Sequence, residues 1–479
     1  MNRRIVKYKL ERNPFVNIPD WLRFAVALYF IIYILFGNIT QLLTEPNIGF
    51  EIIMIVFFRI VIGFMVLVPI LFFRQMGLIH LFAFPFFISL VKRFIQNPES
   101  FITQVVGNGV YLESTIAANL NYYELVNLNL EALIYSFITW VFIFVGFLSF
   151  GDFKYKFPIK YKIPSSRRFI TFSFILISIV LIFFSIQGGI TNWIVQWGEQ
   201  GGRRNAMEGL GPILRLLTVS YIIPLSWYVF RGKVVFSNPY FLIFFLTTIL
   251  MGFFVTGSRS SILHGSIPFI LVYMIRNKNL PLGRFIGLGA VFFVLFGLLG
   301  QIRKTSTYNS GDFSWDKIDF NIEENINNAV EESDKWGSLG ADIATYNYVA
   351  KGGDYLYGKS YVAFLSFWIP RAIWTTKPHG VGYYTGRDIF NSQSGVPPSS
   401  IAEAFWNFDL FGVVLIALFQ GLLIRLISDV YMNNPDNMII ILLYVIILAT
   451  GLQMTSLGLT RILQTLFYAL LALKFLRAI

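Results

Sequence analysis

The sequence lacks cysteine altogether and is poor in charged residues. None of its 479 residues is cysteine, which excludes disulfide bonds, thiol nucleophiles and cysteine-ligated metals. Charged residues account for 13% of the chain, against about 25% in typical soluble domains, while hydrophobic residues account for 56%. These proportions exclude an ordinary soluble protein and indicate a protein embedded in a membrane.

Several chemical signatures are missing as well. The chain has only 3 histidines, and it contains no His-Glu-x-x-His zinc motif, no Gly-x-x-x-x-Gly-Lys-Ser phosphate loop and no paired aspartates of the kind used by metal-dependent nucleotide-sugar transferases. We therefore predict no metal and no cofactor. The net charge of +12 does not indicate nucleic acid, because many basic residues lie in short loops beside apolar runs, where they set membrane topology.

About twelve runs of roughly 15 to 22 residues are apolar enough to form transmembrane helices, which need about 20 residues. We predict an all-α polytopic integral membrane protein in which residues 1–302 form the first nine helices, residues 303–404 one large outer loop, and residues 405–479 the last three helices. The eighth run is short, so a re-entrant segment remains an alternative there. The runs are 21–43, 52–73, 78–95, 132–150, 169–186, 213–230, 240–256, 262–275, 285–302, 405–426, 438–453 and 462–475.

The distribution of basic residues predicts the orientation in the membrane. Arg3, Arg4 and Lys7 place the N-terminus in the cytoplasm, since lysine and arginine are retained on that side. With about twelve crossings the C-terminus is cytoplasmic too, and residues 303–404 lie on the opposite, outer face. Within that loop, residues 361–404 are rich in tryptophan, tyrosine, proline and glycine, which predicts an ordered lid or cleft wall.

Lysine and arginine are expected mainly in cytoplasmic loops, so the basic residues predicted on the outer face are candidates for a binding site. A guanidinium presents a planar fork of donors that matches phosphate oxygens, so we expect an anionic, lipid-linked ligand. Arg259 is the strongest candidate because its glycine- and serine-rich turn exposes backbone N–H groups. The alternative, that each residue reaches headgroups or pairs with a carboxylate, stays open. The candidates are Arg203, Arg204, Arg259, Arg371, Lys377, Arg387 and Arg461.

Acid–base candidates are few. Glu403 lies just before an apolar run, where desolvation would tune a carboxylate for proton transfer, and His379 lies in the long loop beside Lys377. Either residue could deprotonate a sugar hydroxyl, and either could instead be a hydrogen-bonded structural residue. His80, near the inner end of the third run, is expected to be structural.

Three short motifs resemble those of a known family. Residues 369–378 (Ile-Pro-Arg-Ala-Ile-Trp-Thr-Thr-Lys-Pro) and 396–408 (Val-Pro-Pro-Ser-Ser-Ile-Ala-Glu-Ala-Phe-Trp-Asn-Phe) are similar to the large outer loop of Wzy-type oligosaccharide repeat-unit polymerases, which make O-antigen, capsule and exopolysaccharide. Residues 256–261 (Thr-Gly-Ser-Arg-Ser-Ser) are similar to the arginine turn of the same polymerases and of O-antigen ligases.

The resemblance implies a GT-C-like glycosyltransferase in the bacterial cytoplasmic membrane. It would transfer a growing glycan from undecaprenyl pyrophosphate to a hydroxyl of another lipid-linked repeat unit, without metal. Arginines would take the pyrophosphate charge, and Trp374, Tyr383 and Trp406 would stack on sugar rings. A chain-length regulator and a flippase are the implied partners, besides the lipid bilayer.

A lipid-linked oligosaccharide flippase or other transporter is the alternative from a different class. Such a protein should carry charges inside the membrane and show matching halves. Here Arg59 is the clear charge within a run, no internal repeat is visible, and one outer loop dominates. This asymmetry favours an enzyme that works at one face.

Overall fold

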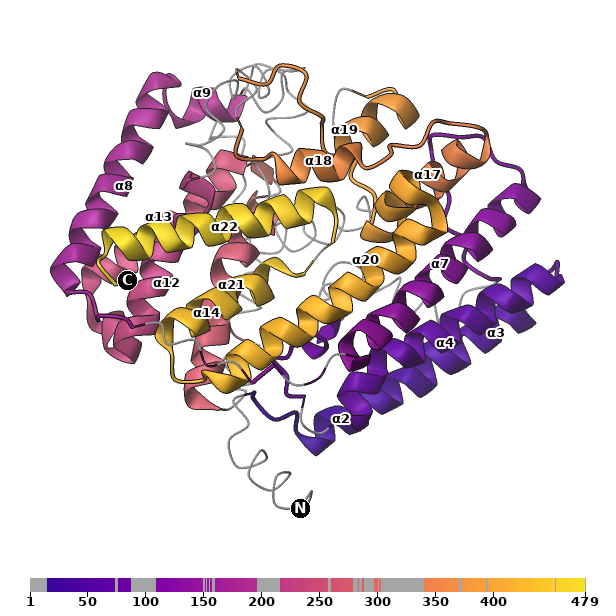
Figure 1. The fold of residues 1–479 in the computed structure, drawn as a ribbon, viewed down its shortest axis with the longest axis horizontal. Helices are drawn as coiled ribbons and strands as arrows, with labels where there is room; N and C mark the ends of the chain where they lie inside the picture. Colours follow the sequence, from indigo (N-terminus) through magenta and orange to yellow (C-terminus); the bar gives the residue numbers. More distant parts are fainter. Residues whose placement is uncertain are drawn as a thin grey trace. The chain divides into compact units, whose positions relative to one another are not determined.

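The computed structural model describes most of the chain, and every regular element in the described residues is a helix (Figure 1). The described residues are 15–73, 76–87, 109–149, 151, 153–154, 156, 160–195, 216–256, 260–278, 283, 287, 297–299, 301–302, 340–369, 373–392, 395–452 and 454–478.

The chain divides into two compact units. The first comprises residues 1–155, 336–433 and 451–463, and the second comprises residues 156–335, 434–450 and 464–479. The described helices of the first unit are α2 (Asp20–Tyr29), the π-helix η1 (Phe30–Phe36), α3 (Gly37–Leu43), α4 (Phe50–Phe72), α7 (Tyr122–Ser149), α17 (Ala341–Ala350), α18 (Lys359–Leu365), α19 (Val381–Tyr384), the π-helix η4 (Thr385–Ile389) and α20 (Ser400–Asn433).

The second unit is built from shorter helices around a buried tryptophan. Trp193 of α9 packs its ring against Phe183 of α8, with ring centroids 5.1 Å apart, and its indole N–H donates to the Phe254 carbonyl of α13 at 2.7 Å. The described helices of this unit are α8 (Ser166–Ile186), α9 (Ile190–Val195), α12 (Ile222–Arg231), the 3₁₀ helix η2 (Gly232–Ser237), α13 (Pro239–Thr256), α14 (Ser260–Asn277) and α21 (Met438–Thr450); α22 (Ser456–Phe475) begins in the first unit and ends in the second.

Six described helices are long and apolar enough to cross a membrane. The predicted all-helical, multi-pass membrane architecture therefore agrees with the described residues, whereas the number of about twelve spans and the GT-C-like arrangement stay predictions. The six are Asp20–Leu43, Phe50–Phe72, Tyr122–Ser149, Ser166–Ile186, Ser400–Asn433 and Ser456–Phe475, and the shorter apolar helices are Pro239–Val255 and Met438–Thr450.

In two of the apolar runs the described helix starts later than predicted. In the third run, residues 78–82 form turns and the helix starts only at Ala83. In the sixth run, α12 starts at Ile222, so Pro224 lies in its first turn, where a proline costs no intrahelical hydrogen bond. Most of the ninth run lies outside the described residues.

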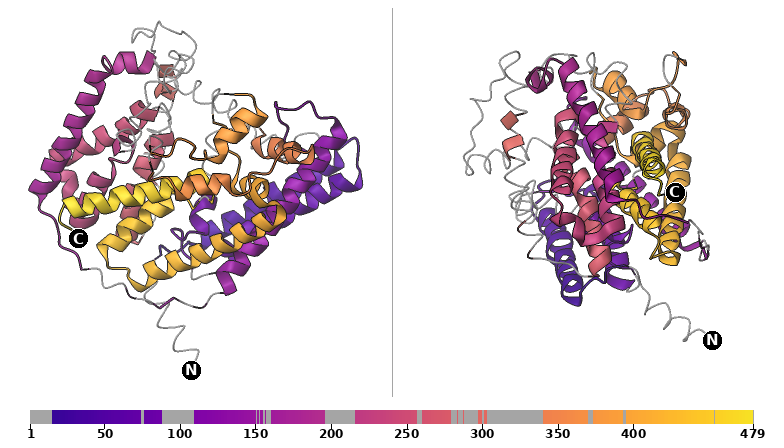
Figure 2. Two further views of the ribbon diagram at one scale, coloured as in Figure 1. Left: turned by 45° about the horizontal axis from the view of Figure 1, so that its top comes forward. Right: turned by 90° about the vertical axis from the view of Figure 1, so that its left-hand side faces the viewer.

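Helices α7 and α20 lie side by side along much of their length (Figures 1 and 2). Two glycines make this close approach possible. A Cβ atom at Gly146 would lie 2.2 Å from the Leu418 carbonyl oxygen, and one at Gly421 would lie 2.1 Å from the Ile143 carbonyl oxygen. Small residues that let two backbones touch are common where helices associate in membranes. Lipid tails are as apolar as the helix surfaces, so close packing rather than the hydrophobic effect holds the helices together.

Helix α20 is broken near its start. Phe408 (φ −147°, ψ 23°) and Asp409 (φ 55°, ψ −153°) leave the helical region, so residues 400–407 form a short first part that precedes the long second part. Gly412 permits the bend, because a Cβ atom there would lie 2.3 Å from the Ala404 carbonyl oxygen. The break turns the side chains of the first part away from the line of the long helix and towards the loop segment 340–399.

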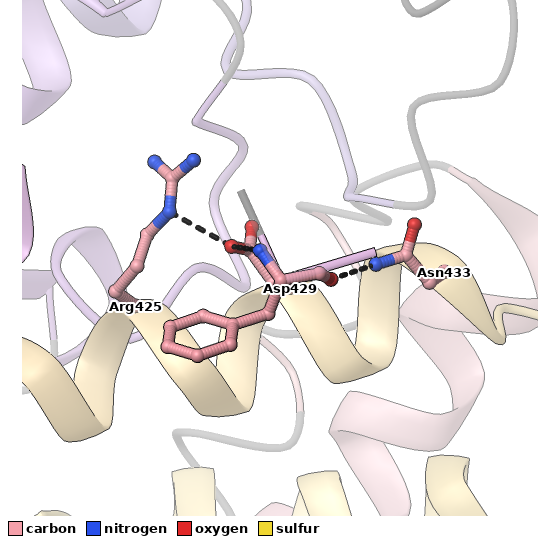
Figure 3. A network of polar contacts seen from close by, with 4 residues as sticks. Arg425, Asp429 and Asn433 are labelled. Atoms are coloured by element: carbon pink, nitrogen blue, oxygen red, sulfur yellow. Dashed lines mark hydrogen bonds and ion pairs between the residues drawn. The ribbon is translucent and has the colours of Figure 1, made fainter. Parts of the chain in front are cut away.

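The far end of α20 binds the segment that follows α7. Figure 3 shows Arg425, Asp429 and Asn433, one turn apart on the same face of the helix. The Arg425 Nε–H donates to Asp429 Oδ2 at 2.8 Å, which also accepts the Phe153 N–H at 3.1 Å. The Asn433 amide donates to the Phe153 carbonyl, so α7 and α20 are joined at this end through polar contacts.

The glycine contact between α7 and α20 can be tested by adding one methyl group. In Gly421→Ala the new Cβ meets a backbone oxygen that cannot rotate away, so we expect the variant to lose about 1–3 kcal/mol of stability, as overpacked sites do. The measurement is the melting temperature of the purified protein in detergent. Gly151→Ala, at a position with open space around it, is the matched control and should melt like the wild type. Equal melting of both variants would mean that the helices are not in close contact.

Candidate functional site

The loop segment 340–399 folds into short helices that rest on α7 and α20. Ile343 and Tyr346 of α17 are fully or almost fully buried in one apolar cluster with Leu128 of α7 and Phe405 of α20. A hydrogen bond fixes the start of α17, because Asp342 Oδ1 accepts the N–H of the residue before α20 at 2.7 Å. The start of this loop segment is thus a packed part of the first unit, and the lid or cleft wall predicted over residues 361–404 stays a prediction.

Glu403 lies in the first turn of α20 and is fully buried. Its Oε2 accepts the backbone N–H of Ser456 at 2.8 Å. Ser456 is the first residue of α22, so the carboxylate faces a helix N-terminus, where unpaired N–H groups and the helix dipole favour negative charge. The Ser456 hydroxyl in turn accepts the Val381 N–H at 3.4 Å, which brings the start of α19 to the same point.

Three further buried groups surround this carboxylate. Asn407, one turn after Glu403, donates its amide to Ser360 Oγ at 2.9 Å and to the Glu403 carbonyl at 2.8 Å. The hydroxyls of Ser360 and Ser456 also lie within hydrogen-bonding reach of the Glu403 carboxylate. We call Ser360, Glu403, Asn407 and Ser456 the Glu403 cluster; it joins α18, α20 and α22 in the interior of the first unit.

The Glu403 cluster keeps unused acceptors. In the described part of the chain, Glu403 Oε1 and Asn407 Oδ1 have no hydrogen-bond partner, and neither does the Tyr361 hydroxyl. Burial, and after it the Glu403 carboxylate, raises the pKa of Tyr361, so this phenol stays protonated. The cluster is polar and enclosed, with the phenol of Tyr361 as a neutral group beside it.

A second group of predicted residues comes together on α19 and η4. The rings of His379 and Tyr383 are stacked with centroids 3.7 Å apart and planes at 12°. Arg387, one turn after Tyr383, donates to the Tyr383 hydroxyl, and its guanidinium carbon lies 5.8 Å from the centre of that ring. We call His379, Tyr383 and Arg387 the His379 stack. His379 is half-buried and Arg387 is exposed, so the stack can be reached from outside.

The two groups are connected through α19. Val381, whose N–H donates to the Ser456 hydroxyl, stands two residues before Tyr383. The Tyr384 hydroxyl accepts the backbone N–H of His379 at 3.3 Å and fixes the chain that carries the imidazole. The enclosed carboxylate therefore helps to hold the element on which the exposed stack is built.

Two other candidates lie on the chain leading to His379. Lys377 is half-buried, and its ammonium donates to the Ile369 carbonyl at 3.0 Å. The indole N–H of Trp374 donates to the Thr376 hydroxyl at 3.1 Å and leaves the half-buried ring at the surface of this turn. Both residues belong to the segment that carries the His379 stack.

Trp406 and Arg461 occupy different environments. Trp406 is 1% exposed, and its indole N–H donates to the Asp354 carbonyl at 2.9 Å, so the ring forms part of the wall behind the turn that follows α17. Arg461 lies on α22 and is exposed. The remaining predicted arginines, Arg203, Arg204, Arg259 and Arg371, lie outside the described residues, and their part in an anion site stays a prediction.

Sequence reasoning overlooked Ser360, Asn407 and Ser456. The spacing of Glu403 and Asn407, four residues apart at the start of one helix, is a signal that could have marked Asn407. The two serines carry no comparable signal, because Ser360 is 47 residues from Asn407 and Ser456 is 53 residues from Glu403. Only the packing of α18 and α22 against α20 brings them to the carboxylate.

Comparison with known proteins adds no assignment: no protein-family model, no curated protein and no solved structure matches this chain. The described fold and site define the class as an all-helical, multi-pass membrane protein. Its packed loop segment carries a partly exposed histidine–tyrosine–arginine stack, which is linked through Val381 and Ser456 to an enclosed carboxylate.

The Glu403 carboxylate can be tested as a structural acceptor. Glu403→Gln keeps an oxygen for the Ser456 N–H and should melt close to the wild type, whereas Glu403→Ala leaves that N–H buried and unpaired and should lose about 1–3 kcal/mol. The measurement is thermal unfolding in detergent, with Asp388→Ala, an exposed carboxylate, as the control. If Glu403→Ala melts like Asp388→Ala, the hydrogen bond to α22 does not stabilise the protein.

Proposed function

We propose that this chain is a glycosyltransferase of the bacterial cytoplasmic membrane that polymerises undecaprenyl-pyrophosphate-linked oligosaccharide repeat units at the outer face, without metal. The observation that carries the proposal is the His379 stack. It presents an imidazole, an aromatic ring and a guanidinium together, on a packed segment between membrane-spanning helices. The resemblance of residues 369–378 and 396–408 to Wzy-type polymerases supports the same function.

The proposed reaction makes one glycosidic bond and breaks one bond to phosphate. The hydroxyl oxygen of the acceptor sugar bonds to the anomeric carbon of the donor glycan. The bond from that carbon to the pyrophosphate oxygen breaks, and the lipid pyrophosphate leaves with the electron pair. The hydroxyl proton passes to a general base, which raises the rate by about 10²- to 10⁴-fold in typical enzymes.

We assign the role of base to His379 and a positioning role to Glu403. An imidazole is largely unprotonated near pH 7 and can accept a proton, and the His379 ring is only half-buried. The Glu403 carboxylate is fully buried, and one of its oxygens is already paired with α22. A substrate hydroxyl would reach the first residue more readily than the second.

Cationic and aromatic side chains complete the proposed site. Arg387 donates to the Tyr383 hydroxyl, and its other N–H groups, which bind no other described residue, would take the charge that develops on the leaving pyrophosphate. Lys377 stands on the same segment, and Arg203, Arg204, Arg259, Arg371 and Arg461 are proposed to contribute further. Trp374 and Tyr383 offer ring faces for sugars.

The orientation of the loop segment can be tested by labelling, because the chain has no cysteine of its own. Tyr357→Cys lies at an exposed position of the segment and should react in intact cells with a maleimide that cannot cross membranes. Ser165→Cys, also exposed, should react only after the cells are opened. The reverse pattern would place the His379 stack in the cytoplasm and overturn the proposed function.

The reaction itself can be tested with purified protein in vesicles. Supplied with lipid-linked repeat units, the wild type should produce a ladder of longer glycans, also in the presence of a metal chelator. His379→Ala should reduce the rate by about 10²- to 10⁴-fold. Arg387→Lys keeps the charge without the fork of donors and should lose about tenfold. Lys359→Ala, an exposed residue outside the stack, is the control.

The same vesicles discriminate the proposed enzyme from a transporter. Movement of lipid-linked glycans across the bilayer without elongation would identify a flippase. The charge within the second run does not require that alternative, because Arg59 donates to the Tyr111 carbonyl and lies near Glu113. If His379→Ala elongates the glycan at the wild-type rate, His379 is not the base.

A further inference from the structure

A pocket of about 380 Å³ lies in the first unit, and none of its lining residues belongs to the Glu403 cluster. It is formed by three segments: the chain before α7, one face and the end of α17, and the end of η4. Its lining includes Ala118, Asn347, Tyr348, Lys351, Gly353 and Asp388. All of these residues are described, and four of them carry polar side chains.

Glycine contacts hold the walls of the pocket in place. A Cβ atom at Gly353 would lie 2.3 Å from the Tyr348 ring, so the chain runs directly against this aromatic side chain. The Trp406 ring packs against the same ring in an edge-to-face arrangement, with centroids 5.5 Å apart. Gly340, at φ +58°, brings the Ser114 carbonyl against the start of α17, because a Cβ atom there would lie 2.1 Å from that oxygen. The chain on this side of the pocket is therefore closely packed.

The polar side chains of the pocket are unused in the described part of the chain. Asn347, Lys351 and Asp388 make no side-chain hydrogen bond or ion pair with other described residues. Lys351 and Asp388 are exposed, and Asn347 is half-buried. Together they offer an ammonium, a carboxylate and an amide around the ring of Tyr348, with donors and acceptors both present.

We propose that this pocket binds an uncharged sugar residue of the glycan substrate. A pyranose has an apolar C–H face that fits an aromatic ring, and a rim of hydroxyls that both donate and accept hydrogen bonds. Tyr348 would provide the ring, and Asn347, Lys351 and Asp388 would pair with the hydroxyls. A pyrophosphate fits poorly because the single ammonium is offset by a carboxylate, and a polyprenyl tail fits poorly because the rim is polar.

The position of the pocket assigns which sugar it takes. Asp388 directly follows Arg387, so η4 carries one member of the His379 stack and one residue of the pocket wall side by side in the sequence. The reacting bond is proposed to lie at the His379 stack. A sugar held in the pocket would therefore belong to another part of the glycan. This assignment of the glycan rests on the proposed function, whereas the pocket and its sugar chemistry do not.

Direct binding tests the pocket without the reaction. The probes are short oligosaccharides of neutral hexoses and N-acetylhexosamines, free of lipid and pyrophosphate. Binding to purified protein in lipid nanodiscs is followed by saturation-transfer NMR and by equilibrium titration. Ala118→Trp fills the pocket from its half-buried rim and should abolish binding, and Asp388→Ala should weaken it by about tenfold. Lys359→Ala is the control. The melting temperature of each variant is measured as well, so that a loss of binding can be told from a loss of folding.

The outcomes separate the pocket from the proposed function. Loss of binding in Ala118→Trp with retention in Lys359→Ala supports the pocket. No binding by the wild type, equal binding by Ala118→Trp, or displacement of the sugar by inorganic pyrophosphate would each overturn it. If the wild type binds the oligosaccharides but forms no ladder from lipid-linked units, the polymerase proposal fails and the sugar site stands.

Discussion

The described part of the first unit depends on one buried interaction, the hydrogen bond from the Ser456 N–H to the Glu403 carboxylate. A buried carboxyl group is costly unless it is hydrogen-bonded, and the bond that Glu403 Oε2 accepts from Ser456 holds the start of α22 against the start of α20. The same carboxylate lies beside Ser360 of α18, and Ser456 also accepts the Val381 N–H of α19. Four elements therefore share a single polar centre, and the orientation of each is coupled to the others.

The backbone of α20 makes this centre possible. An unbroken helix would carry residues 400–407 along the line of the long second part, which packs on α7 through Gly146 and Gly421. The break at Phe408 and Asp409 allows the first part to serve the loop segment while the second part remains in the helix pair. One helix thus combines a span that is apolar enough for lipid with a short part that organises polar groups.

Burial divides the candidate residues into two kinds. Glu403 and Trp406 are enclosed and hold other elements in place, whereas His379, Tyr383 and Arg387 stand where a substrate can approach. This division suits a site that handles a charged, lipid-linked glycan, because exposed donors and ring faces bind it and the enclosed network keeps them rigid. The pocket beside η4 extends the same surface with groups suited to uncharged hydroxyls.

Hydropathy along the sequence determined the class of this protein. A long apolar run in a membrane forms a helix, because a helix pairs its backbone N–H and C=O groups within one segment. Residue type marked His379, Tyr383 and Arg387 as separate candidates for a base, a ring for sugars and a contact for pyrophosphate, and the structure shows that they are stacked. Only the tertiary structure decided that Ser360 and Ser456 surround Glu403, that the third run opens in turns, and that α20 breaks at Phe408. These features depend on contacts between residues that are tens of positions apart, and on packing that no local pattern of polar and apolar residues encodes.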